Sequence, residues 1–184
     1  LWDEFHPNLY LLTVHSGDDV YETNFGLRQI SIKGRQLYIN GRPLFLRGTV
    51  ENCLFPETGY PPTSKEEWLR IFKKCKDYGL NHVRFHSYCP PDAAFCAADE
   101  TGIYLQPEGP SWPNHGVKLR SGQPIDDYLL EESYRIINEY GHHPSFVMMA
   151  AGNEPAGNWV SYCNDWVRQM HDYDSTRVYC GASV

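Results

Sequence analysis

A glutamate and an asparagine stand directly after the most apolar run of the chain. Phe146 to Ala151 has the composition of a strand buried on both faces, and Asn153 and Glu154 follow it after one glycine. A carboxyl at the mouth of such a strand loses solvation, which raises its pKa and favours a general acid. The neighbouring amide could hydrogen-bond a substrate hydroxyl. The same Asn-Glu-Pro run would also suit the start of a helix, with Glu154 at the positive end of the helix dipole. Spacing alone leaves both interpretations open.

Similar polar groups end the other predicted strands. Carboxylates can act as general acids and bases, amides can hydrogen-bond hydroxyl groups, and aromatic rings can stack on the faces of sugars. Together these groups indicate a carbohydrate site. They are Glu51 and Asn52 after the first strand, His86, Ser87 and Tyr88 after the second, and Glu108, Trp112, Asn114 and His115 after the third. Trp112 lies in a polar loop and is the candidate for stacking. The apolar helix faces that carry Trp68, Trp159 and Trp166 predict core positions instead.

Strands and helices alternate through the second part of the chain. Strands are predicted at 43–48, 82–87, 103–107, 146–152 and 177–182, and helices at about 63–79, 90–102, 126–140 and 159–170. This rhythm indicates an α/β fold with a parallel sheet, either doubly wound or a (β/α) barrel. In both folds, functional groups gather at the carboxyl ends of the strands. No Gly-x-Gly-x-x-Gly follows a strand, so a dinucleotide-binding sheet has no support.

The first part of the chain is predicted to be all β. Strands are expected at 9–14 and 20–32, joined by a turn at 17–19. Asn40-Gly41 predicts a tight hairpin between 36–39 and 42–47, because both turn positions need positive φ. Further along, the Pro/Gly/Ser-rich segment 107–124 is too long for a plain connector and is a candidate functional loop.

Composition limits the possible partners. The chain has 184 residues, of which 41% are hydrophobic and 14% aromatic, so a folded core is expected. A formal net charge of -7 without a Lys/Arg stripe argues against nucleic acid. No apolar run approaches the ~20 residues of a membrane span, so no membrane partner is expected. The six cysteines show neither a C-x-x-C pair nor zinc-finger spacing to histidine. The compartment stays undetermined, since any signal peptide would lie upstream of Leu1.

Four ordered segments resemble one enzyme family. The run from Gly141 to Pro155, with His-Pro-Ser, an apolar strand and Gly-Asn-Glu, is similar to the acid/base segment of glycoside hydrolase family 2, the β-galactosidase, β-glucuronidase and β-mannosidase group. The other segments are similar to the start of the family's barrel, to its second and third strands, and to the close of its immunoglobulin-like domain. They are 25–30 with 37–48, 78–84 with 99–104, and 1–2 with 7–10.

The resemblance implies a fold and a domain division. Residues 1–32 would be the C-terminal strands of an immunoglobulin-like β-sandwich. Residues 33–184 would be the N-terminal part of a TIM-barrel catalytic domain, a partial (β/α)8 barrel of about five strands. A whole barrel takes about 250 residues, so the chain is expected to be a fragment of a longer enzyme.

The resemblance also implies residue roles. Glu154 would be the general acid/base on the fourth barrel strand, and Asn153 would contact the sugar 2-hydroxyl. Glu108 would shape the site, although pairing with Arg84 is an alternative role for it. His86 matches only approximately, because the family has Ser-His-Tyr where this chain has His-Ser-Tyr. The galactosidase branch holds a metal after the third strand. This chain has Gly-Pro-Ser-Trp at 109–112 and His115 out of register, so we expect no metal there and no cofactor. Asn52 stays a substrate-binding candidate on its strand-end position alone.

The expected function is that of a retaining glycosidase fragment that cleaves terminal β-linked sugars. The family's nucleophile lies on the seventh strand, so it is expected outside this chain, and the isolated chain is expected to be inactive. The alternative is a non-catalytic carbohydrate-binding or scaffold module on the same fold.

An open strand edge at 177–181 would allow pairing with a second copy. His142 and His143 precede the apolar strand on the side away from catalysis and are expected to be structural. The identity of the sugar is undetermined.

Overall fold

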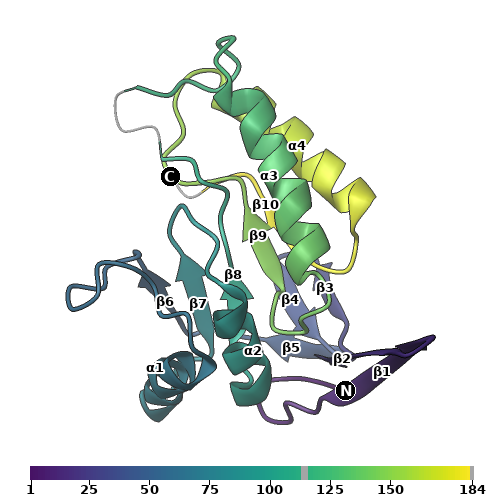
Figure 1. Ribbon diagram of the computed structural model, residues 1–184. Coiled ribbons are helices and arrows are strands. Elements are labelled where there is room, and N and C mark those ends of the chain that lie inside the picture. The colour runs from purple at the N-terminus through teal and green to yellow at the C-terminus, as the bar shows by residue number, and fades with distance from the viewer. Residues whose placement is uncertain (113–115, 183–184) are drawn as a thin grey trace.

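The chain folds into a small antiparallel part followed by a larger α/β part (Figure 1). The computed structural model describes residues 1–112 and 116–182. The antiparallel part holds β1 (Tyr10–Ser16), β2 (Asp19–Phe25), β3 (Ile30–Lys33), β4 (Gln36–Ile39) and β5 (Arg42–Leu44). The α/β part holds β6 (Gly48–Glu51), α1 (Lys65–Asp77), β7 (His82–Phe85), α2 (Asp92–Thr101), β8 (Tyr104–Gln106), α3 (Ile125–Tyr140), β9 (Met148–Ala150), α4 (Trp159–Tyr173) and β10 (Val178–Cys180).

Two hairpins form where turn residues predict them. β1 and β2 pair antiparallel around Gly17, and β4 pairs with β5 around Asn40-Gly41. Asn40 and Gly41 have φ of 51° and 78°, as a two-residue hairpin turn requires. The prediction of one continuous strand at 20–32 is wrong, because residues 26–29 are not in a strand and separate β2 from β3. There Arg28 donates to the backbone carbonyls of Pro144 and Phe146 at 3.1 and 2.7 Å, which ties this segment to the α/β part.

The five parallel strands follow one another in sequence order. β6, β7 and β8 form one sheet, β9 pairs with β10, and single bridges from Leu105 to Phe146 and from Glu108 to Ala150 join β8 to β9. A doubly wound sheet would reverse its strand order, whereas this order advances steadily around an axis as in a barrel. The barrel is not closed, because β6 and β10 each have one strand neighbour in the described residues.

The predicted first parallel strand at 43–48 is wrong. The Asn40-Gly41 turn commits residues 42–44 to antiparallel pairing with β4, and the first parallel strand is β6 at Gly48–Glu51. Between them, the backbone N–H of Arg47 donates to Asn81 Oδ1 at 2.7 Å, just before β7 begins. The expected domain boundary between residues 32 and 33 lies inside β3, which pairs with β4.

Helices and strands bury two adjoining cores. The larger includes Trp68 of α1, Phe95 of α2 and Trp166 of α4 against the parallel strands, as their apolar spacing predicts, with Trp159 half-buried at its edge. The smaller joins Trp2, Ile39 and Leu44 to Tyr104 and Val147, so β3–β5 pack against the α/β part. Ser64 caps α1 and accepts the backbone N–H of Glu67. Gly102 ends α2 in the left-handed conformation with φ of 70°.

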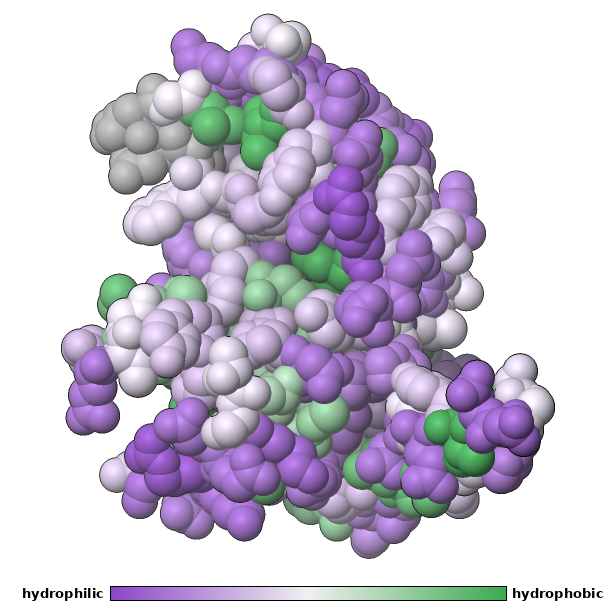
Figure 2. All heavy atoms as spheres, viewed as in Figure 1, coloured by the Kyte–Doolittle hydropathy of each residue, from purple (hydrophilic) through white to green (hydrophobic). Residues whose placement is uncertain are grey.

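The β1–β2 hairpin projects from the body and exposes apolar side chains. Figure 1 shows it extending away from the sheets, and Figure 2 shows hydrophobic side chains among hydrophilic ones at the same place. Leu11, Val20 and Tyr21 are 61%, 58% and 64% exposed. None of the described helices combines the length and apolar character needed to cross a bilayer.

Candidate active site

The carboxyl ends of the parallel strands carry the candidate residues to one edge of the partial barrel. Glu51 ends β6, His86 follows β7, Glu108 follows β8, and Asn153 and Glu154 follow β9. Parallel strands all end at the same edge, so these positions meet there. Side-chain contacts form a buried group and an exposed group among them, and Glu51 belongs to neither.

Arg84 organises the buried group. Its Nε lies 2.5 Å from Glu108 Oε1, and its Nη2 donates to Asn153 Oδ1 at 2.7 Å. Glu108 is fully buried, and its second oxygen accepts the backbone N–H of Ser87 at 2.8 Å. Both Glu108 oxygens are therefore engaged, and the pairing with Arg84 that the sequence left as an alternative is confirmed. Arg84 orients the Asn153 amide through Oδ1, and the NH₂ of this amide, which has no partner among the described residues, can donate to a ligand.

Glu154 and Trp112 form the exposed group. Trp112 Nε1 donates to Glu154 Oε2 at 2.8 Å, and both side chains are exposed. The Trp112 ring meets the His86 ring edge to face, with centroids 4.8 Å apart. The prediction that the strand mouth would bury the Glu154 carboxyl is wrong: β9 ends at Ala150, and Glu154 projects beyond it on a backbone with φ of 41°.

The helix-cap interpretation of Asn153-Glu154-Pro155 is also wrong. α4 begins at Trp159 with Asn158 at its N-cap, four residues beyond Glu154. The backbone N–H of Asn153 instead donates to the carbonyl of Ser111 at 2.8 Å, which anchors the end of β9 to the loop that carries Trp112. The Glu154 carboxylate therefore belongs to the strand-end site.

Glu51 and Asn52 occupy the end of β6 in different ways. Glu51 accepts the backbone N–H of Cys53 at 2.8 Å and the hydroxyl of Tyr88. Burial raises the pKa of the Glu51 carboxyl above its ordinary value. Asn52 is exposed in the loop after β6. Among the described residues no hydrogen bond joins its side chain to the other candidates, so the structure does not bring Asn52 into either group.

Sequence reasoning missed the central position of Arg84 and the contribution of Ser111. The available signal for Arg84 was a charged residue between the apolar Val83 and Phe85 of strand β7, whereas nothing local marks the Ser111 carbonyl. Asn114 and His115 lie outside the described residues. The stretch 109–112, where we expected no metal, provides one buried serine and the exposed Trp112.

The family model for the TIM barrel domain of glycosyl hydrolases family 2 matches residues 30–182. The chain belongs to glycosyl hydrolase family 2. This membership confirms the family resemblance, and it identifies the α/β part as a TIM-barrel fold rather than a doubly wound sheet. Residues 1–10 lie outside the matched range, so their resemblance to the close of an immunoglobulin-like domain stays a prediction.

Two curated relatives cover most of the chain. It is 32% identical over 160 residues to a protein named "Putative beta-glucuronidase" from Formosa agariphila, a match that covers 84% of this chain and 19% of that protein. It is 25% identical over 166 residues to a β-galactosidase of Staphylococcus xylosus, with coverage of 84% and 17%. The chain therefore spans less than a fifth of the length of each of these family members.

Solved structures share the fold. A β-glucuronidase of an uncultured Clostridium sp. superposes with a TM-score of 0.86 at 24% identity, covering 100% of this chain and 33% of that one. A β-glucuronidase of Parabacteroides merdae superposes with a TM-score of 0.78 at 24% identity, covering 97% and 24%. These likenesses show that the open arrangement of five strands is a fold shared with part of each of these longer chains.

Proposed function

We propose that this chain supplies the general acid/base of a retaining β-glycosidase and that Glu154 is that residue. The observation that carries the proposal is the contrast among the strand-end carboxylates. Glu51 and Glu108 each have both oxygens engaged by the protein. Glu154 is exposed, and its one described partner is an exposed indole N–H, so its carboxyl is accessible to a glycosidic oxygen.

The neighbouring side chains fit this role. Glu154 would protonate the leaving-group oxygen and then, as a carboxylate, activate the water that releases the sugar. Trp112 would orient that carboxylate through its Nε1–H and offer its ring, 52% exposed, to a sugar face. Asn153, held by Arg84, would donate its amide NH₂ to the 2-hydroxyl beside the bond that breaks. His86 would support the Trp112 ring from its edge.

The second carboxylate of the reaction would come from outside these 184 residues. A retaining pair has its carboxyl groups about 5–5.5 Å apart across the scissile bond. Among the described residues, Glu51 and Glu108 are the other strand-end glutamates, and their engaged oxygens leave no free nucleophile. The proposal therefore treats the chain as part of a larger enzyme, with 1–32 from an immunoglobulin-like domain and 33–184 from the barrel, and it expects the isolated chain to be inactive.

The proposed substrate class is a terminal β-linked sugar, in line with the relatives that carry β-glucuronidase and β-galactosidase names. The test uses the enzyme that contains this chain, with Glu154→Gln compared with native on two β-glycosides. For a poor alkoxide leaving group, loss of the acid should lower kcat/KM by about 10²–10⁴-fold. For a dinitrophenyl leaving group, which needs no protonation, formation of the glycosyl-enzyme should be far less affected.

Azide provides a second readout in the same experiment. It needs no general base, so it should restore turnover of the dinitrophenyl substrate by Glu154→Gln and form a β-glycosyl azide. The exposed α1 carboxylate changed in Glu66→Gln is the matched control and should leave both substrates unaffected. Equal losses on the two leaving groups, or full activity of Glu154→Gln, would contradict the assignment.

The exposed Trp112 ring also favours a second candidate, a carbohydrate-binding module without turnover. Such a module needs the stacking ring and not the carboxyl. Calorimetry of simple sugars with the 184-residue chain separates the two candidates. Loss of binding in Trp112→Ala with unchanged binding in Glu154→Gln, together with an enzyme that shows no turnover, would support the binding module.

A further inference from the structure

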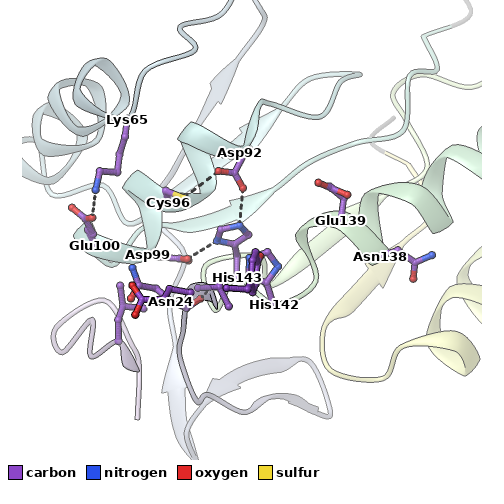
Figure 3. Close-up of a pocket in the computed structure, with 14 residues that line it drawn as sticks. Asn24, Lys65, Asp92, Cys96, Asp99, Glu100, Asn138, Glu139, His142 and His143 are labelled. Carbon is purple, nitrogen blue, oxygen red and sulfur yellow. Dashed lines mark hydrogen bonds and ion pairs between the residues drawn. The ribbon is translucent and has the colours of Figure 1, made fainter. Parts of the chain in front are cut away.

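Three side chains with metal-ligating atoms converge between α2 and the turn before β9. Asp92, Cys96 and His143 each direct one ligand atom toward the others, and these atoms all lie within 4.8 Å of one another. Figure 3 shows Asp92 and Cys96 on one side of α2 facing the imidazole of His143. None of the three belongs to the strand-end site, so the proposed function leaves this cluster unexplained.

Two of the spacings in this cluster are close to those of a tetrahedral zinc site. With Zn–N and Zn–O bonds near 2.0–2.1 Å and a Zn–S bond near 2.3 Å, tetrahedral geometry separates N from O by about 3.3 Å and S from either by about 3.6 Å. His143 Nε2 lies 3.2 Å from Asp92 Oδ1, and Cys96 Sγ lies 3.3 Å from Oδ2, the other oxygen of the same carboxylate. Small side-chain rotations would place the three atoms around one ion.

His143 is already oriented as a metal ligand. Its Nδ1 bonds the buried Asp99 carboxylate at 2.6 Å, which leaves Nε2 directed at Asp92. Asp99 is in turn held by the backbone N–H of Ser145 at 3.0 Å. A carboxylate behind the second ring nitrogen is the usual outer partner of a zinc-bound histidine. The structural role predicted for His143 is thus compatible with a further one.

The helix supplies the other two ligands with the right spacing. Asp92 and Cys96 are one turn apart on α2 and so share a face of the helix. Both open onto a cavity of about 570 Å³ that is also bordered by Glu22 of β2 and Glu139 of α3, so its electrostatic field favours a cation. The cavity leaves room for water at the fourth coordination position.

We propose that Asp92, Cys96 and His143 bind one zinc ion that clamps α2 to the turn before β9. A mixed imidazole, thiolate and carboxylate set suits zinc better than magnesium or calcium, which prefer oxygen ligands alone. Binding releases the Cys96 thiol proton to solvent, and the metal–thiolate bond replaces the hydrogen bond from Cys96 to Asp92. The site is independent of Glu154 and of glycoside cleavage.

Cobalt(II) is the probe, because a thiolate ligand produces a near-ultraviolet charge-transfer band on that ion. The metal-free 184-residue chain is titrated with cobalt(II) and then with zinc, with circular dichroism as the check of folding. We expect one cobalt per chain with the thiolate band, full displacement by zinc, and a rise in Tm with zinc. Absence of the band in the native chain would overturn the proposal without any variant.

Variants identify the ligands. Loss of an outer partner costs about 10–100-fold in affinity, so loss of a direct ligand in Cys96→Ser should abolish the band and weaken zinc binding by more than about 100-fold. Asp92→Asn changes a side chain that is 65% exposed, so it should weaken binding while the fold is kept. Cys53→Ser, at an exposed free cysteine, is the matched control and should change nothing. A band that survives in Cys96→Ser, or disappears in Cys53→Ser, contradicts the site.

Discussion

At the residue scale, Arg84 separates the buried Glu108 from the exposed Glu154. It neutralises the buried Glu108 and at the same time holds the Asn153 carbonyl oxygen. A buried carboxylate without its partner is strongly unfavourable, so removing either charge would leave the other buried and unpaired, at a cost in stability. Glu154, only one residue from Asn153, takes no part in this pair and remains exposed.

A matched pair of substitutions tests this division. Glu108→Gln leaves the Arg84 charge without its buried partner, so we expect the free energy of unfolding to fall by about 3 kcal/mol. Glu154→Gln is the same chemical change at an exposed position and should alter it by less than about 0.5 kcal/mol. Urea denaturation of both variants measures the difference. Equal stability losses would contradict the buried role of Glu108.

His82 makes stability depend on pH. Burial lowers the pKa of this imidazole from 6.5 to about 4, and the nearby Arg84 charge acts in the same direction. Above pH 6.5 the His82 imidazole is mostly neutral in both the folded and the unfolded chain. Between pH 6.5 and about 4 the unfolded chain binds the proton and the folded chain does not, so stability is lost as the pH falls through this window.

The expected loss from this one group is about 3 kcal/mol at pH 4, since each pKa unit corresponds to about 1.4 kcal/mol. The measurement compares urea denaturation of the native chain and of His82→Gln at pH 7 and pH 4. Other titrating groups affect both proteins alike, so the native chain should lose more stability than the variant. Parallel pH profiles would show that His82 does not stay neutral in the fold.

At the element scale, two glycines let strand ends approach closely enough to build the site. A Cβ on Gly152 would lie 2.4 Å from the carbonyl oxygen of Ser111, and one on Gly109 would lie 2.6 Å from that of Ala151. The Ser111 carbonyl accepts the backbone N–H of Asn153. The loop that carries Trp112 and the segment after β9 that carries Glu154 can therefore approach closely because neither glycine has a side chain.

Gly152→Ala tests this close approach. The added methyl meets backbone rather than a flexible side chain, so we expect a loss of about 1–3 kcal/mol in the free energy of unfolding. In the enzyme that contains this chain, displacement of Asn153 should also raise KM. Gly116→Ala is the control, because a Cβ there meets no atom of the described residues within 4 Å. Two equally stable alanine variants would contradict the account.

Local signals were sufficient for most elements. The apolar faces of α1 and α4, the stop at Gly102 and the Asn40-Gly41 hairpin were all predictable, because each depends on residues a few positions apart. The position of the first parallel strand was not predictable in the same way. Apolar residues at 43–46 suit either kind of pairing, and only the turn before them and the Asn81 contact after them separate the two.

At the scale of the whole molecule, both ends of the row of parallel strands have an unpaired side. β6 pairs with β7 alone and β10 with β9 alone among the described residues. Unpaired strand edges offer N–H and C=O groups to another chain. Pairing with a second copy through β10 therefore stays a prediction, since nothing in a single chain tests it.

Light scattering across a concentration series measures that association. We expect the average mass of the isolated chain to rise with concentration, and a charge on the edge strand in Val178→Lys to reduce the rise. Val160→Lys makes the same change on an exposed face of α4 and should leave the association unaffected. A strictly monomeric native chain at high concentration would contradict the prediction.

Motifs read along the chain were enough to predict the family, the alternation of strands and helices, and the strand-end positions of the polar residues, because these depend on residue type and local spacing. Tertiary structure decided which carboxylates are paired and which is exposed, and it brought His143 to Asp92 and Cys96. Those properties depend on contacts between residues 24 to 69 positions apart, such as Arg84 with Glu108 and with Asn153. The burial and charge environment of a side chain exists only once such distant segments have packed together.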